Sequence, residues 1–166
     1  PSLVVVTWYL LRKQTADKFL AFGLVRALGV LPHDVPSPIV GIMTKRPTSV
    51  GDLELFNECN VIVATIHTVG VGVDTRLLTT IAQRCEALIL DEAHHVAATN
   101  WARLKAAFQS VPILQFTATP FRRDGQLVDG RVIFNYSLGE RESDKIEGWP
   151  TMGREEKEHQ WCREEE

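Results

Sequence analysis

The sequence predicts an α/β fold in which a parallel β-sheet has helices packed on both of its faces. Five short runs of apolar, mostly β-branched residues recur along the chain with little alternation between apolar and polar positions. Such runs are typical of strands that are covered on both faces. Segments with helical periodicity separate them, which favours parallel βαβ units. The predicted strands are Leu3–Thr7, Pro38–Met43, Val61–Thr65, Ala87–Asp91 and Ile113–Thr117.

The length and composition indicate one domain outside the membrane. The chain has 166 residues, and its hydrophobic content of 45% is enough for a sizeable core. No apolar stretch approaches the ~18–20 residues that span a bilayer, and no basic region precedes the first apolar run as it would in a signal peptide. Cys59, Cys85 and Cys162 show no CxxC pairing, which indicates neither a disulfide framework nor a zinc site. We expect a cytoplasmic protein with no membrane partner.

The segments between the predicted strands have helical features. Residues 9–28 carry apolar side chains near helical spacing. Asp74 can cap a helix over Thr75–Arg84, and Asn100 can cap a helix over Trp101–Phe108. The apolar side chains of the first capped helix fall on one stripe: Leu77, Leu78, Ile81, Ala82 and Cys85.

The periodic pattern ends after Gly139. Residues 140–166 hold ten acidic and five basic side chains, a balance of −5 against −3 for the whole chain, which leaves +2 for residues 1–139. The charged segment is predicted to be a solvated or disordered tail, or alternatively a helix that packs on a partner. A mildly basic core is compatible with binding to a phosphate backbone.

Two adjacent carboxylates follow the apolar run at residues 87–90. In parallel sheets the functional groups gather at the carboxyl ends of the strands, which is where Asp91 and Glu92 fall. Hydrolysis of ATP requires Mg²⁺ on the β- and γ-phosphates and a water aligned on the γ-phosphorus. We expect Asp91 to bind the Mg²⁺ and Glu92 to act as the general base. The alternative is that the two carboxylates only open a loop and cap a helix.

Two segments resemble motifs of the superfamily 2 helicases. Asp91-Glu92-Ala93-His94 resembles motif II, the DEAH box, and Thr117-Ala118-Thr119 resembles motif III. The first predicted strand is followed by Thr7-x-x-x-Leu11-x-x-Gln14, which is similar to motif Ia with threonine in place of its proline. Residues 63–68 resemble a further segment that reads Ala-Thr-x-Gln-Thr in many members. The doubled histidine at 94–95 is more similar to the restriction-enzyme-type branch, which includes type III restriction subunits.

The resemblance implies a RecA-like ATP-binding domain over residues 1–139, with motifs Ia to III. It implies ATP and Mg²⁺ as cofactors and nucleic acid, DNA in this branch, as the partner. His94, Thr117 and Thr119 would couple the nucleotide state to the bound strand. Side chains after two of the predicted strands would contact the nucleic acid: Thr65, His67, Thr68 and Gln14.

One motif of the family is missing from the sequence. None of the eleven glycines is followed by lysine, so the phosphate-binding loop that precedes motif Ia is absent. We therefore expect a fold that is incomplete at its N-terminus, with an apolar gap in the middle of the sheet. A second RecA-like domain, which supplies the arginine finger, is also expected in the complete protein. The fragment alone is predicted to be inactive.

Two other functions remain open. The chain could be a non-catalytic, helicase-like remnant or an accessory module that binds nucleic acid or a partner. It could also belong to another class of P-loop ATPase that uses the same carboxylate strand. The Thr-Ala-Thr segment at 117–119 disfavours this last class.

Overall fold

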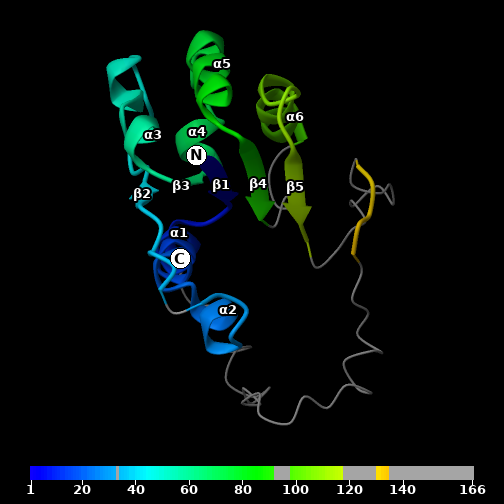
Figure 1. Cartoon of the computed structure of the whole chain (residues 1–166). Helices are drawn as coiled ribbons and strands as arrows, with labels where there is room; N and C mark the ends of the chain where they lie inside the picture. Colours follow the sequence, from blue (N-terminus) through cyan, green and yellow to red (C-terminus); the bar gives the residue numbers. More distant parts are fainter. Residues whose placement is uncertain (33, 92–97, 118–129, 135–166) are drawn as a thin grey trace, which may run out of the picture. The chain divides into compact units, whose positions relative to one another are not determined.

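The computed structural model describes residues 1–32, 34–91, 98–117 and 130–134. The chain divides into two units, Pro1–Val128 and Asp129–Glu166. All the described helices and strands belong to the first unit (Figure 1). The charged tail that the sequence predicts over residues 140–166 lies outside the described residues.

The described part of the chain forms a five-stranded sheet with the order β2-β3-β1-β4-β5. All four strand pairs are parallel, so the predicted α/β class with a parallel sheet is confirmed. Of the observed strands, the third and fourth have the predicted bounds, the first is displaced by one residue, the fifth ends one residue earlier, and the second is shorter than predicted. They are β1 (Ser2–Val6), β2 (Val40–Ile42), β3 (Val61–Thr65), β4 (Ala87–Asp91) and β5 (Ile113–Phe116).

Among the described residues, six α-helices and one 3₁₀ turn connect the strands: α1 (Tyr9–Ala21), α2 (Gly23–Ala27), η1 (Gly51–Leu53), α3 (Leu55–Glu58), α4 (Ile66–Val69), α5 (Thr75–Arg84) and α6 (Ala98–Ala107). The prediction for α5 is confirmed, including its cap, because the Asp74 carboxylate accepts a hydrogen bond of 2.8 Å from the N–H of Arg76. In the described ranges no helix has the length and apolar character needed to cross a membrane.

One cap prediction was wrong. The helical spacing over residues 9–28 corresponds to two helices, α1 and α2, because the φ of 50° at Phe22 is left-handed and ends α1. Asn100 lies inside α6 and therefore does not cap it. Caps depend on the backbone conformation of one residue, which apolar spacing does not determine.

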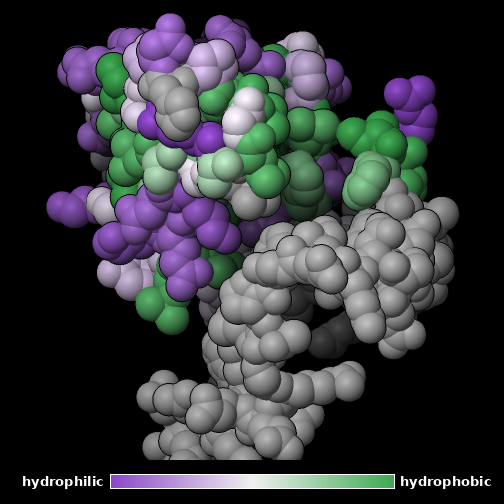
Figure 2. All heavy atoms as spheres, turned by 60° about the horizontal axis from the view of Figure 1, so that its bottom comes forward, coloured by the Kyte–Doolittle hydropathy of each residue, from purple (hydrophilic) through white to green (hydrophobic). Residues whose placement is uncertain are grey.

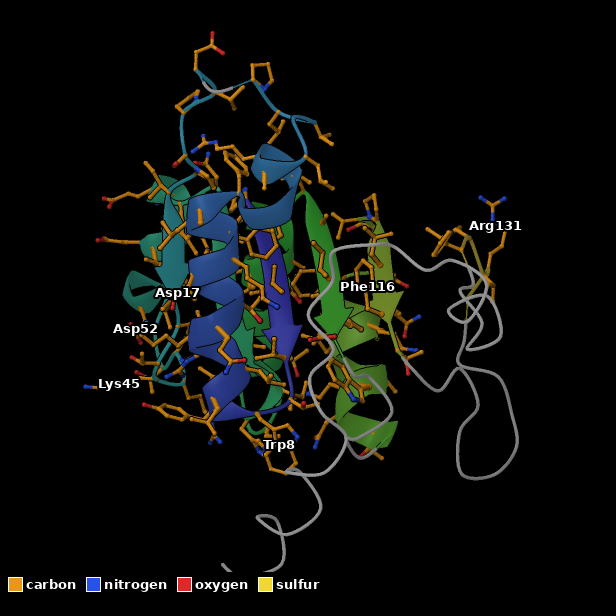
Figure 3. All side chains as sticks on the ribbon, turned by 90° about the horizontal axis from the view of Figure 1, so that it is seen from below. Trp8, Asp17, Lys45, Asp52, Phe116 and Arg131 are labelled. Carbon is orange, nitrogen blue, oxygen red and sulfur yellow. The ribbon has the colours of Figure 1, made fainter. Side chains whose placement is uncertain are left out.

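Helices pack on both faces of the sheet. On one face, α5 and α6 bury apolar side chains against β1, β3 and β4 in a single core cluster. On the other face, Ala16 and Phe19 of α1 pack against Val4 and Val63. Figure 3 shows α1, in blue, in front of the strands. This arrangement leaves the carboxyl ends of the strands as the edge where loops converge.

The strands that the structure describes leave no gap in the middle of the sheet, where the sequence predicts an apolar one. The five strands are paired without interruption from β2 to β5. Exposed apolar surface lies instead on the outer strand β5, where Leu114 and Phe116 leave 38% and 57% of their surface exposed. Leu114 is the register partner of Ile89, which is partly buried against the second core cluster. The expectation of a central gap was therefore wrong.

Candidate functional site

The candidate site lies at the carboxyl edge of the sheet. Because all the strands are parallel, their last residues lie along one edge, towards which the arrows of β4 and β5 point in Figure 1. The predicted site residues fall into two groups along this edge. One group follows β4 and β5, and the other follows β1 and β3.

The first group contains the predicted metal ligand. Asp91 is the last residue of β4 and is partly exposed. Its register partner on β5 is Phe116, and Thr117 is the next residue of the chain. Thr117 therefore follows directly after the register partner of Asp91, at the same edge of the sheet. Three further predicted residues lie outside the described residues: Glu92, His94 and Thr119.

Asp91 is the described residue that the sequence predicts as a Mg²⁺ ligand, and its carboxylate is partly exposed. Among the described residues, no group of three or more His, Cys, Asp or Glu side chains is placed to hold a metal. Mg²⁺ commonly keeps several waters and binds one or two carboxylates together with substrate phosphates. A partly exposed carboxylate at the end of a strand fits such a ligand set, in which the phosphates supply the remaining oxygens.

The second group begins with a capped turn after β3. Thr65 ends β3 and caps the short helix α4, where its Oγ1 accepts a hydrogen bond of 3.3 Å from the N–H of Thr68. The two hydroxyls lie 2.8 Å apart, and both residues are buried. His67 is exposed between them. The threonine pair thus stabilises the turn, and His67 is the side chain of this segment that a ligand can reach.

Gln14 lies further from the edge. It is exposed on α1, about one and a half turns beyond the first helical residue, Tyr9. On the same helix, Arg12 reaches the backbone just after β2.

Arg12 was missed in the sequence analysis. Its Nη1 donates a hydrogen bond of 3.0 Å to the carbonyl of Met43, directly after β2, and its guanidinium carbon lies 4.9 Å from the centroid of the Tyr9 ring. Arg12 is only 8% exposed. Its spacing of four residues from the buried Ala16 placed it on the face of α1 that packs against the sheet, and this is the signal that could have found it.

The loop after β2 adds two basic side chains that were also missed. Lys45 and Arg46 are exposed. The guanidinium of Arg46 lies against Gly72, where a Cβ atom would come within 2.9 Å of Nη1. Gly72 has a φ of 66°, a conformation that glycine adopts without strain. The loops after β2 and after α4 are therefore neighbours.

Both loops are held in place by polar contacts. The carboxylate of Asp52 accepts hydrogen bonds from the N–H groups of Thr48 and Ser49, at 2.8 and 2.9 Å. These bonds, chiefly that from Thr48, lower the pKa of Asp52 to about 2. The side chain of Arg103 on α6 donates hydrogen bonds to the carbonyls of Gly70 and Val73 and to Oγ1 of Thr75. Hydrogen bonds therefore hold both the loop after β2 and the neighbouring segment after α4.

A parallel sheet with helices on both faces is the arrangement of a RecA-like α/β domain. The family of the type III restriction enzyme, res subunit, matches residues 1–122. The chain belongs to this family. None of the curated proteins compared with the chain matches it. The prediction of a restriction-enzyme-type, helicase-like domain is thus confirmed at the level of the family, whereas the DEAH assignment stays a prediction.

Proposed function

We propose that the chain is part of the ATP-hydrolysing motor domain of a DNA helicase or translocase. The observation that carries this proposal is the pairing of Asp91 with Phe116, the residue before Thr117, at the carboxyl edge of the sheet. Membership of the res subunit family supports it. In this proposal, residues 1–139 are a partial RecA-like domain, and the second RecA-like domain belongs to the complete protein.

The residues at the first group would act on ATP. Asp91 would hold Mg²⁺ together with the phosphates of ATP, and Glu92 would accept the proton of the attacking water. When bound, the ion would neutralise negative charge on the β- and γ-phosphates. His94, Thr117 and Thr119 would change their hydrogen bonds when the γ-phosphate leaves. The assignment of residues 91–94 as a DEAH-type motif II is part of this proposal.

The second group would bind the nucleic acid. Exposed His67 and the basic pair Lys45 and Arg46 lie after β3 and β2, and phosphate contacts of this kind fix the register of a strand without reading its sequence. Thr65, Thr68 and Gln14 would support this surface, the threonines by holding the turn. DNA is the expected nucleic acid.

The central strand β1 joins the two groups. Its Val5 is the register partner of Leu90, the residue before Asp91, and its Val6 is the register partner of Thr65. A rearrangement beside Asp91 therefore needs to pass through only one strand to reach the turn after β3. This arrangement supports coupling between ATP hydrolysis and nucleic-acid binding.

The test is ATP hydrolysis by the full-length protein, wild type against Glu92→Gln. We expect the variant to bind nucleotide but to lose several orders of magnitude in turnover, since the general base is removed while the shape is kept. A matched control is Glu86→Gln, because Glu86 is exposed directly before β4 at the opposite edge of the sheet. If Glu92→Gln and Glu86→Gln hydrolyse ATP equally fast, the proposed catalytic role is wrong.

A second candidate is a non-catalytic module that binds nucleic acid. The exposed basic side chains of Lys45 and Arg46 favour it, since binding to a phosphate backbone needs no ATP. It predicts that the full-length wild type binds an oligonucleotide but shows no ATP turnover, which the same measurement detects.

A further inference from the structure

The start of α1 exposes a surface that the proposed function does not yet use. Trp8, Tyr9 and Leu10 follow β1 at the carboxyl edge, and 64%, 70% and 69% of their surface is exposed. These three consecutive large side chains form an exposed apolar patch. Such patches on a protein surface commonly mark sites of interaction. Two of the three carry flat aromatic rings.

The Tyr9 ring is held by a cation that is itself fixed. The guanidinium of Arg12 lies 4.9 Å from the ring centroid and is anchored by its hydrogen bond to the Met43 carbonyl. A cation near an aromatic ring stabilises the position of that ring. A ring with a defined position loses less conformational freedom on binding than a mobile one.

The surroundings of the aromatic pair favour a negatively charged ligand. The first turn of α1 contains no acidic residue, and its free N–H groups give this end of the helix partial positive charge. Oγ1 of Thr7, in the residue before the helix, is buried and has no hydrogen-bond partner. Across the Arg12 bridge, Lys45 and Arg46 are exposed, and neither forms an ion pair with another described residue.

Figure 3 shows two of these groups, Trp8 and Lys45, towards the same end of the sheet, the end to which the strand arrows point. Figure 2 shows hydrophilic side chains, in purple, next to apolar ones on the face that is turned forward from that end. A surface that combines rings with positive charge matches a polymer that has flat bases and a phosphate backbone.

We propose that Trp8 and Tyr9 form a stacking platform for the bases of single-stranded nucleic acid, and that Lys45 and Arg46 contact its phosphates. Stacking on aromatic rings is tolerant of sequence, and a positive surface follows the backbone. In a duplex the faces of the bases are covered by their neighbours, so the platform selects the single strand. This inference rests on the proposed function and adds to it the form of the nucleic acid.

The experiment compares two fluorescein-labelled oligonucleotides by anisotropy, using the full chain. One is a 20-nucleotide oligothymidine, and the other has the same backbone with abasic sites. We expect the wild type to bind oligothymidine at least about tenfold more tightly than the abasic strand. Trp8→Ala and Tyr9→Ala should each lose about tenfold in affinity for oligothymidine and leave the affinity for the abasic strand unchanged.

Matched variants separate stacking from general effects. Leu10→Ala removes an equally exposed apolar side chain from the same turn but no ring, so it should bind both strands as the wild type does. Trp8→Phe keeps a ring and should retain most of the preference for bases. Lys45→Gln should weaken binding to both strands equally and lower the slope of log K against log salt by about 0.7.

The outcomes that overturn the proposal are distinct. If the wild type binds both strands equally, or if Trp8→Ala weakens both equally, the platform is wrong while nucleic-acid binding stands. If the wild type binds neither strand, the platform and the nucleic-acid part of the proposed function are both wrong. If Trp8→Ala changes the sedimenting mass of the chain and not its affinity for oligothymidine, the rings form a contact between copies.

Discussion

The guanidinium of Arg12 donates a hydrogen bond of 3.0 Å to the carbonyl of Met43. The two residues are 31 positions apart in the chain, and the bond joins the first turns of α1 to the loop after β2. The same guanidinium lies near the Tyr9 ring. One buried side chain therefore positions an aromatic ring and orders the start of the basic loop.

Replacement of Arg12 by methionine should lower the free energy of unfolding by about 1.5–3 kcal/mol, because a buried carbonyl loses a charged donor. Urea unfolding at pH 7 measures the change. Lys13→Met is the control on the same helix, since Lys13 forms only an exposed ion pair with Asp17, and such pairs contribute about 0–1 kcal/mol. Equal losses in the two variants would contradict a structural role for the Arg12 bond.

Gly72→Ala should weaken binding to an oligonucleotide, and Gly29→Ala should not. Both glycines have left-handed φ angles, 66° and 70°, so each substitution should cost about 1–2 kcal/mol of stability. A Cβ at Gly72 would meet Nη1 of Arg46 at 2.9 Å, whereas one at Gly29 would meet nothing within 4 Å. Because the tip of Arg46 can move, the difference should appear in affinity, measured by anisotropy. Unchanged affinity in Gly72→Ala would show that Arg46 does not contact the ligand.

The 166-residue chain by itself should not hydrolyse ATP appreciably. Its sequence has no Gly-Lys pair to cradle the phosphates, and the loss of such a lysine and of an arginine finger is expected to cost orders of magnitude in rate. Release of phosphate from ATP, with and without single-stranded DNA, is the measurement. Turnover stimulated by DNA would refute this expectation.

Asp52 should make stability depend on pH at the acid end. Its pKa is lowered from 3.8 to about 2 by hydrogen bonds from the backbone at Thr48 and Ser49. The carboxylate therefore stabilises the fold above pH 3.8, and this contribution is lost as the pH falls through about 2. Asp52→Asn should unfold at lower urea than the wild type at pH 7, and the difference should vanish near pH 2. Asp17→Asn, at an exposed pair, should show a much smaller difference at every pH.

Much of the sheet could be predicted because its pattern is local. The strands β3 and β4 begin and end where the apolar runs do, and the helix α5 has both a stripe of apolar residues and a side-chain cap. The break at Phe22 could not be predicted, since a left-handed φ at a bulky residue arises from the path of the whole connection. The start of α6 before Asn100, the residue expected to cap it, could likewise not be predicted from local spacing.

The candidate site could be predicted only in part. Asp91 and Thr117 follow apolar runs, so a parallel sheet is enough to place them at one edge. The contacts of Arg12 with Met43 and of Arg46 with Gly72 join segments that are far apart in the chain. No local pattern encodes such contacts. The same is true of the burial of Thr65 and Thr68, which depends on how the turn after β3 packs.

Arg103 links α6 to the segment between α4 and α5, so that the two would move together. From α6 it reaches three acceptors on the stretch between Gly70 and Thr75, the same stretch on which the Arg46 guanidinium rests. In the chain, α6 begins at Ala98, seven residues after β4 ends at Asp91. A tilt of that helix would therefore displace the segment against which the guanidinium of Arg46 lies, although Arg46 precedes α6 by more than 40 residues.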